Sequence, residues 1–315
     1  MTSAPRPTCG EQPSPSRAQL SVVAFGELAA HVFGAFPSRP PASDRLRLGR
    51  VHLTLGGGSA LVCQQLARLG HRVALEAMAG DDEVGTWLIS EVKARGVRCE
   101  TPLRTGIRTG RTLVLHDTSG HHDIVHEPSD GTPGLLVEKV PDVWPDGVPY
   151  AYCPGFPGFE PVLEALARAG APIAVDLGYR PWLTDPVGYR ASVLARAPYC
   201  HVCLLSGDGL ARDQQARMMR EASGAGASLV VLTLGADGSL ILVGGEVVHV
   251  DAVPRSPVNT LGAGDALAAG LLAGLVEGRG PAEALALGNA TAAAVISAFP
   301  ALPDRACVDR LNSGQ

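Results

Sequence analysis

The chain contains no stretch of 18 or more apolar residues, which excludes an ordinary transmembrane helix. The apolar centre of a secretory signal is missing as well, because residues 1–20 are polar and rich in proline and serine. We expect residues 1–20 to form a disordered tail and the protein to be cytoplasmic.

Basic character is also missing. The net charge is −5, so the sequence gives no reason to expect nucleic acid or an anionic membrane as a partner. A zinc site of two cysteine pairs is also absent, because Cys200 and Cys203 form a lone CxxC inside an apolar run, with no second pair at zinc-site spacing. We interpret them as buried thiols and assign no residues to a resident metal.

The sequence does contain the pattern of a layered α/β domain. Hydrophobic residues make up 46% of the 315 residues and charged residues 18%, an ordinary globular balance. Short apolar runs bounded by turns alternate with longer amphipathic segments, which predicts a mostly parallel sheet with helices on both faces. The predicted strands are 21–25, 72–77, 112–116, 150–153, 173–176, 201–205, 229–234 and 239–243. The predicted helices are 59–69, 83–94, 159–169, 187–197, 208–221, 263–277 and 281–298.

Two regions, at about residues 32–55 and 104–129, interrupt this alternation of predicted strands and helices. Both contain alternating apolar and polar residues and no helical pattern. Such alternation is typical of strands with one solvated face. We therefore expect a small separate sheet.

The clearest chemical motif lies at Asn259–Asp265, with the sequence NTLGAGD before an apolar helix. The N–H groups at a helix start are unpaired and the helix dipole is positive there. The small residues Gly262, Ala263 and Gly264 allow a phosphate to approach closely. Asp265 falls in the first turn, where a carboxylate can accept a proton from an attacking hydroxyl. Taken alone, the motif is also compatible with a simple tight turn.

In this context the sequence resembles the ribokinase-like, or phosphofructokinase-B, carbohydrate kinases over about residues 21–299. The NTLGAGD segment is similar to the family's C-terminal signature. The other matching segments, in order, are residues 56–70 (GGGSALVCQQLARLG), 80–97 (GDDEVGTWLISEVKARGV), 176–182 (DLGYRPW) and 230–242 (VVLTLGADGSLIL).

The resemblance implies a three-layer α/β/α sandwich with a β-sheet lid, formed by residues 21–315, with lid segments at about 32–55 and 104–129. It implies an ATP- and Mg²⁺-dependent kinase that acts on a hydroxyl of a sugar or sugar-like polyol, such as a cyclitol or pseudo-sugar. The lid sheets of such proteins often pair between subunits, so a homodimer through the lid is also expected.

The resemblance further implies roles for individual residues. Asp265 would be the catalytic base, and Gly262, Ala263 and Gly264 would stabilise the transferring phosphoryl group. The nucleotide side would include Thr233, Gly235, Gly238, Asn259 and Asn289. The substrate side would include His31, Gly56, Gly57, Leu61 and Asp176.

Four departures from the family pattern concern the positions for substrate and ions. His31 stands where sugar kinases usually have an aspartate, at what resembles the end of the first strand. Leu61 replaces a substrate-binding asparagine. Ser206 and Gly209 replace the ends of an Asn-x-x-Glu segment involved in Mg²⁺ binding, with Asp208 next to it. Asn259 replaces an aspartate that often helps bind a monovalent cation.

These departures leave two alternatives open. One is a nucleoside kinase of the same fold, and the other is a catalytically weak regulator that binds a ligand. The histidines of the second lid segment, His121, His122 and His126 together with Asp123, are interpreted as part of a solvated turn rather than as substrate contacts. Arg111 and Arg180 are interpreted as surface or salt-bridge residues.

Overall fold

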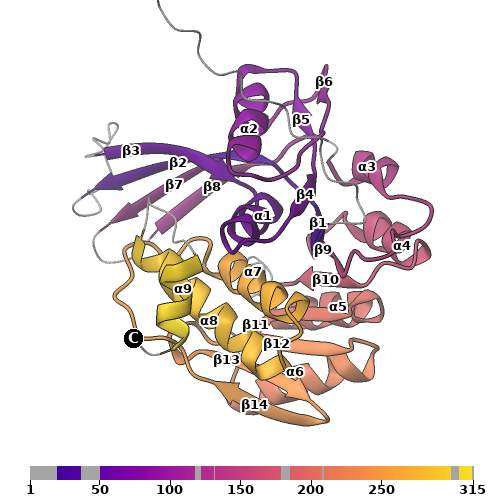
Figure 1. Ribbon diagram of the computed structural model, residues 1–315, viewed down its shortest axis with the longest axis vertical. Helices are drawn as coiled ribbons and strands as arrows, with labels where there is room; N and C mark the ends of the chain where they lie inside the picture. The colour runs from indigo at the N-terminus through magenta and orange to yellow at the C-terminus, as the bar shows by residue number, and fades with distance from the viewer. Residues whose placement is uncertain are drawn as a thin grey trace, which may run out of the picture.

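An eight-stranded sheet forms the centre of the protein (Figure 1). The computed structural model describes residues 20–36, 50–117, 122–130, 132–178, 185–207, 209–298 and 305–313. The strand order is β14-β13-β12-β11-β10-β9-β1-β4; the strands from β12 to β4 are parallel, while β13 and β14 are antiparallel. The bounds are β1 (Val22–Phe25), β4 (Val73–Glu76), β9 (Tyr150–Pro154), β10 (Ile173–Asp176), β11 (Val202–Ser206), β12 (Leu229–Thr233), β13 (Ser239–Val243) and β14 (Glu246–Val250).

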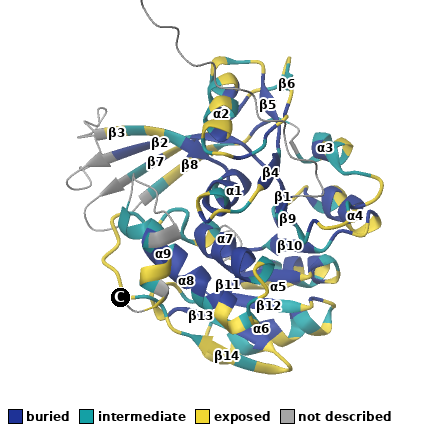
Figure 2. Ribbon diagram, in the orientation of Figure 1, coloured by how far each residue is buried: buried dark blue, intermediate teal, exposed yellow. Residues whose placement is uncertain are grey.

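Helices cover both faces of this sheet. One face packs against α1, α2, α7 and α8, and the other against α3, α4, α5 and α6. Strand β1 is buried along its whole length because successive side chains point into opposite layers: Val22 and Ala24 into one, Val23 and Phe25 into the other. Figure 2 shows both buried layers in dark blue. The bounds are α1 (Gly58–Arg68), α2 (Glu83–Ala94), α3 (Thr132–Leu136), α4 (Glu160–Arg168), α5 (Pro186–Arg196), α6 (Arg212–Gly224), α7 (Ala263–Val276), α8 (Pro281–Ala298) and α9 (Arg305–Asn312).

The predicted elements of the central layer agree closely with the structure. The bounds of β10, β13, α2 and α8 are those expected. Three elements, α3, α9 and β14, were not predicted. Helix α6 begins at Arg212, four residues later than predicted. The CxxC thiols are buried, as expected, with Cys203 on β11.

A second sheet projects to one side of the first, and we call it the lid (Figure 1). It has four strands in the order β3-β2-β7-β8. Residues near 104, which were expected in the lid, instead form a short pair with the β5 strand. The bounds are β2 (Ala29–Phe36), β3 (Arg50–Gly56), β7 (Gly110–Asp117) and β8 (His122–Glu127) in the lid, and β5 (Ala79–Gly80) and β6 (Leu103–Arg104) in the pair.

The register of the lid decides which side chains face the body of the protein. His31 pairs with Thr112, and Thr112 pairs with His126. Paired residues in a sheet share a face, so these three side chains form a row. All three line the cleft beneath the lid.

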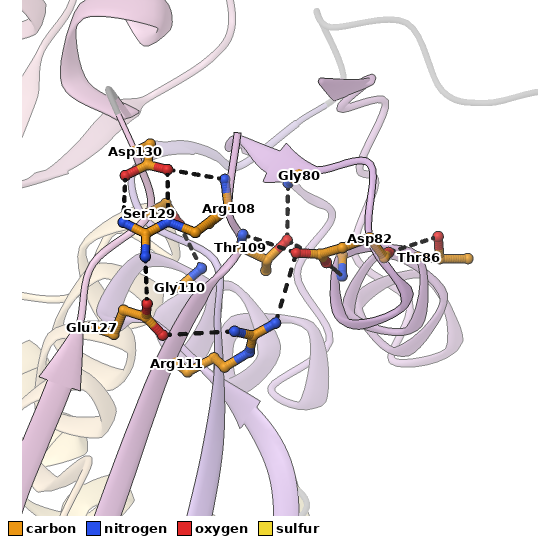
Figure 3. A network of polar contacts seen from close by, with 11 residues as sticks. Gly80, Asp82, Thr86, Arg108, Thr109, Gly110, Arg111, Glu127, Ser129 and Asp130 are labelled. Carbon is orange, nitrogen blue, oxygen red and sulfur yellow. Dashed lines mark hydrogen bonds and ion pairs between the residues drawn. The ribbon is translucent and has the colours of Figure 1, made fainter. Parts of the chain in front are cut away.

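Polar contacts tie the base of the lid to helix α2 (Figure 3). Asp82 caps α2 by accepting from the Gly85 N–H at 2.7 Å, and it also accepts from the Thr109 hydroxyl at 2.8 Å. Arg111 on β7 lies between Asp82, at 3.9 Å, and Glu127 on β8, at 3.6 Å. The salt-bridge interpretation of Arg111 is therefore confirmed, and the lid is anchored where β7 leaves the core.

Most of the predicted N-terminal tail, residues 1–19, lies outside the described residues. Leu20, which was assigned to that tail, is 2% exposed and packs in the core beside β1. No helix in the described part of the chain is long and apolar enough to span a membrane.

Candidate active site

The carboxyl ends of the central strands form one wall of a large cleft. The chain runs from β1 outward to β4, and later from β9 outward to β12, so the strand order reverses between β1 and β9. Open α/β sheets bind ligands outside the carboxyl ends of the strands at such a point. Asp176 at the end of β10 and Thr233 at the end of β12 both line this cleft.

Helix α7 begins in the middle of the cleft. Its N-cap, Gly262, has a φ of 83° in the left-handed region, a conformation that favours glycine. This turn lets the chain enter the helix with Gly262, Ala263 and Gly264 all lining the cleft. The first N–H groups of a helix have no partner within the helix, and its dipole makes this end positive. The α7 start is therefore suited to an anionic group such as phosphate.

Asp265 lies in the first turn of α7, beside the start of α1. A Cβ placed on Gly58 would lie 3.0 Å from the Asp265 Oδ1, and a Cβ placed on Gly262 would lie 3.8 Å from the Leu61 Cδ1. Burial raises the pKa of Asp265 to about 8, and the nearby Asp176 carboxylate adds to the rise. A carboxyl group with such a pKa is poised to exchange a proton near neutral pH.

Asp176 is held by two hydrogen bonds at the end of β10. The Gly178 N–H donates to its Oδ1 at 2.8 Å, and the buried Tyr152 hydroxyl donates to its Oδ2 at 3.4 Å. Burial raises the pKa of Asp176, while these two hydrogen bonds oppose the rise. Two carboxyl groups therefore line the same cleft, and the charge on Asp176 disfavours the ionisation of Asp265.

The predicted nucleotide side lies beyond β12. Thr233 ends that strand, a short 3-10 turn follows at Gly235–Asp237, and Gly238 leads into β13. Thr233, Gly235 and Gly238 all line the cleft. This is the strand–turn–strand arrangement expected from the sequence.

The two asparagines of the predicted nucleotide side are engaged in the fold. Asn289 on α8 accepts from the Ser239 hydroxyl at 2.8 Å and donates to the carbonyls of Val250 and Asp251 at 3.1 and 3.0 Å, although it lines the cleft. Asn259 accepts from the Leu261 N–H at 3.0 Å and is not a lining residue. A contact of either with a nucleotide stays a prediction.

His31 occupies a different element from the one expected. It lies on the lid strand β2, not at the end of β1, because the chain turns into the lid immediately after residue 28. Its Nε2 accepts from the Gly57 N–H at 3.4 Å, and a Cβ at Gly56 would overlap its ring. Burial lowers the pKa of His31 to about 4, and the charge on His126 adds to the fall while Glu27 opposes it. The imidazole is therefore neutral at pH 7.

Glu27 and His126 form a pair in the cleft that sequence analysis missed. The His126 Nε2 lies 3.4 Å from the Glu27 Oε2, and its Nδ1 lies 2.9 Å from the Thr112 hydroxyl. Glu27 is 8% exposed and also accepts from the Ser129 N–H at 3.0 Å. The hydrogen bond to Glu27 raises the pKa of His126, and burial opposes this.

The interpretation of His126 as part of a solvated turn is therefore wrong. His126 lies on β8 with its side chain in the cleft, because the register aligns it with Thr112 and His31. The alternating pattern of β8 alone does not show which of its two faces points into the cleft. That depends on the register with β7, which the sequence does not reveal. His121, Arg180 and Asp208 lie outside the described residues.

The cleft brings most of the predicted site residues together. Its volume is about 2430 Å³, which exceeds the roughly 300–1,000 Å³ typical of a pocket for one small ligand. Gly56 and Asn259 do not line it. The predicted residues that do are His31, Gly57, Leu61, Asp176, Thr233, Gly235, Gly238, Gly262, Ala263, Gly264, Asp265 and Asn289.

Comparison with known proteins decides the family. The sequence matches the pfkB family of carbohydrate kinases at residues 19–136 and 164–302. The chain belongs to the pfkB carbohydrate kinase family. The family expected from the motifs is thereby confirmed.

Individual relatives of this pfkB family protein are distant. A 2-dehydro-3-deoxygalactonokinase of Haloferax volcanii is 26% identical over 300 residues, which cover 86% of this chain and 89% of that protein. Adenosine kinase from Sinorhizobium meliloti superposes with a TM-score of 0.78 at 22% identity, over 94% of this chain and 100% of that one. A nucleoside kinase of Burkholderia thailandensis, solved with inosine, gives a TM-score of 0.76 at 20% identity, over 93% and 96%. These likenesses confirm the ribokinase-like fold.

Proposed function

We propose that this protein is an ATP-dependent kinase that transfers the γ-phosphate to a hydroxyl of a sugar or sugar-like molecule, with Asp265 as the general base. The observation that carries the proposal is the position of Asp265. It lies in the first turn of α7, within the same cleft as the strand ends on the nucleotide side and the inner face of the lid. Base and anion site are thus adjacent, with room for an acceptor under the lid.

The chemical step uses this arrangement directly. The acceptor hydroxyl gives its proton to the Asp265 carboxylate as its oxygen forms a bond to the γ-phosphorus. The bond from that phosphorus to the bridging oxygen breaks, and ADP leaves with the electron pair. The helix start at Gly262, Ala263 and Gly264 stabilises the charge on the transferring group through the positive end of the helix dipole and the Gly264 N–H. The Ala263 N–H donates to the Thr260 carbonyl at 3.3 Å.

Mg²⁺ is proposed to enter with the nucleotide. Among the described residues, no group of three or more His, Cys, Asp or Glu side chains is arranged to hold a metal ion. Mg²⁺ usually keeps several waters and binds through substrate phosphates and one or two carboxylates. The Asp176 carboxyl group in the cleft fits that kind of site, while Asp265 is reserved for the proton transfer. When bound, the ion would neutralise charge on the phosphates.

An assay of ADP release tests the function. Mg-ATP is offered with neutral sugars, cyclitols, pseudo-sugars, nucleosides and acidic sugars, against a reaction without acceptor. We expect turnover that depends on one acceptor class and falls by about a factor of a thousand in Asp265→Asn. Binding of ATP and acceptor without turnover would instead identify a ligand-binding regulator.

We also propose that two copies associate through the outer face of the lid. On this face Val51, Leu53 and Val125 are 55%, 57% and 62% exposed. Leu53 pairs with Val32 on β2, which pairs with Leu113 on β7. Leu113 pairs in turn with Val125 on β8, so Leu53 and Val125 lie in one row across the lid. An apolar row of this kind is typical of a surface that a protein partner covers.

The oligomeric state tests this second proposal. We expect light scattering to give the mass of a dimer for the wild type and of a monomer for Leu53→Glu. The matched control is His52→Glu, one residue away and on the opposite face. A monomeric wild-type protein would contradict the proposal.

A further inference from the structure

The part of the cleft under the lid, where we place the acceptor, has an unusual balance of charged side chains. Its ionisable side chains under the lid are Glu27, His31 and His126. Glu27 and His126 are paired with each other at 3.4 Å, and His31 is uncharged at pH 7. Among the described lining residues, Arg212 and Arg255 are the arginines and no lysine occurs. Arg212 is the first residue of α6, and Arg255 lies on the connection between β14 and α7, so neither is on a lid strand.

This balance disfavours an anionic acceptor. On the lid strands, the only side chain lining the cleft among the described residues that could offer a carboxylate or phosphate a positive charge at neutral pH is His126, which is already paired with Glu27. Such a group would also lie in the same cleft as the buried carboxyl groups of Asp265 and Asp176, which repel it whenever they are ionised. Burying an unpaired charge in such a site is strongly unfavourable. The groups that are available, the Thr112 hydroxyl and the neutral His31 ring, suit uncharged hydroxyls.

The same end of the cleft has an apolar wall. Ile124 lies on β8 two residues from His126, so both side chains face the cleft, and Ile124 is 45% exposed there. Phe156 and Phe159 also line the cleft, and their rings meet edge to face with centroids 6.2 Å apart. Phe159 is only 4% exposed, so Phe156 presents most of this aromatic surface. Pro128 and Pro133 extend this surface. A simple sugar offers hydroxyls on nearly every carbon and would leave this wall without an apolar partner.

From these observations we infer that the acceptor is an uncharged polyol that carries an apolar substituent. The polyol lies against Thr112 and the Glu27–His126 pair, and the substituent covers Ile124 and Phe156. This inference rests on the proposed kinase function, because it concerns the acceptor of that reaction. It adds the class of molecule that the cleft selects.

Matched acceptors test the inference. They are a free hexose, its phenyl glycoside and its uronic acid. Their binding is measured by calorimetry with a non-hydrolysable ATP analogue and Mg²⁺ present, and their turnover is measured by ADP release with ATP. We expect the phenyl glycoside to bind at least about tenfold more tightly than the free hexose, since it buries the apolar wall. We expect the uronic acid to bind at least about tenfold more weakly than the hexose.

Two variants locate the effect. Ile124→Ala removes apolar surface from the cleft and should reduce the preference for the phenyl glycoside about three- to tenfold. Val248→Ala, at an exposed position of the edge strand β14 that does not line the cleft, should leave that preference unchanged. An equal preference in both variants would overturn the assignment to this wall.

The outcomes separate the inference from the proposed function. Turnover that favours the free hexose or the uronic acid overturns the inference and leaves the kinase function intact. Preferential binding of the phenyl glycoside without turnover supports the inference about the site and overturns the kinase function. Neither binding nor turnover of any of the three overturns both.

Discussion

The pH dependence of catalysis gives the sharpest prediction from the site. Burial and Asp176 raise the pKa of Asp265 to about 8, and only the ionised carboxylate accepts a proton. We therefore expect kcat/KM to rise with pH and to level off above about pH 8. The profile of kcat/KM reports ionisations of the free enzyme, which is the state that the structure describes.

The size of the expected change in kcat/KM follows from the shift in the pKa of Asp265. The pKa of Asp265 rises from 3.8 to about 8, roughly four units, or about 6 kcal/mol against ionisation. A group with a pKa of 8 is ionised in about one molecule in a hundred at pH 6 and in about half at pH 8. Between these two values kcat/KM should therefore increase about fiftyfold.

A substitution of Asp176 tests whether its charge contributes to the raised pKa of Asp265. Asp176→Asn removes a like charge, so the midpoint of the profile should move to lower pH, while burial keeps it above the ordinary range. The midpoint is the measured quantity because the plateau also reflects any contact of Asp176 with substrate. Glu246→Gln, on the exposed edge strand β14, is the control and should leave the midpoint in place. A flat profile between pH 6 and 9, or an unchanged midpoint in Asp176→Asn, would refute the reasoning.

Two further predictions concern stability. Folding keeps Asp265 protonated up to about pH 8, whereas the unfolded chain ionises it near 4, so this group lowers stability progressively as pH rises from about 4 to about 8. Asp265→Asn should therefore raise Tm at pH 8 and change it little at pH 4, and a lower Tm at pH 8 would contradict this. Asp82 caps α2 and binds Thr109, so Asp82→Ala should cost about 1–2 kcal/mol in denaturant unfolding. Asp81→Ala, at an exposed neighbour, should cost much less; equal losses would count against the cap.

The central layer could be predicted because its determinants are local. Strand β10 is a buried apolar run of four residues that ends at Asp176. Helix α2 begins at Glu83, directly after its N-cap Asp82, and this local signal in the sequence allowed its start to be predicted. The position of Asp265 in the first turn of α7 follows from the glycine at residue 262, whose left-handed conformation begins the helix.

The lid side of the site could not be predicted because it depends on pairing between distant segments. Strand β2 pairs in parallel with β7, and only this register places His31 beside Thr112. Glu27 accepts from the N–H of Ser129, 102 residues along the chain. No local pattern indicates that Glu27 and His126 meet. The sequence therefore predicted the α7 side of the cleft more completely than the lid side.

The most direct test of the account is whether Asp265 accepts the proton during phosphoryl transfer. A single-turnover experiment would measure the transfer of labelled γ-phosphate to a bound acceptor in the wild type and in Asp265→Asn, with ATP binding measured separately. We predict that the variant binds ATP within about threefold of the wild type and transfers phosphate about a thousandfold more slowly. Transfer within about tenfold of the wild-type rate would contradict the assignment of Asp265 as the base.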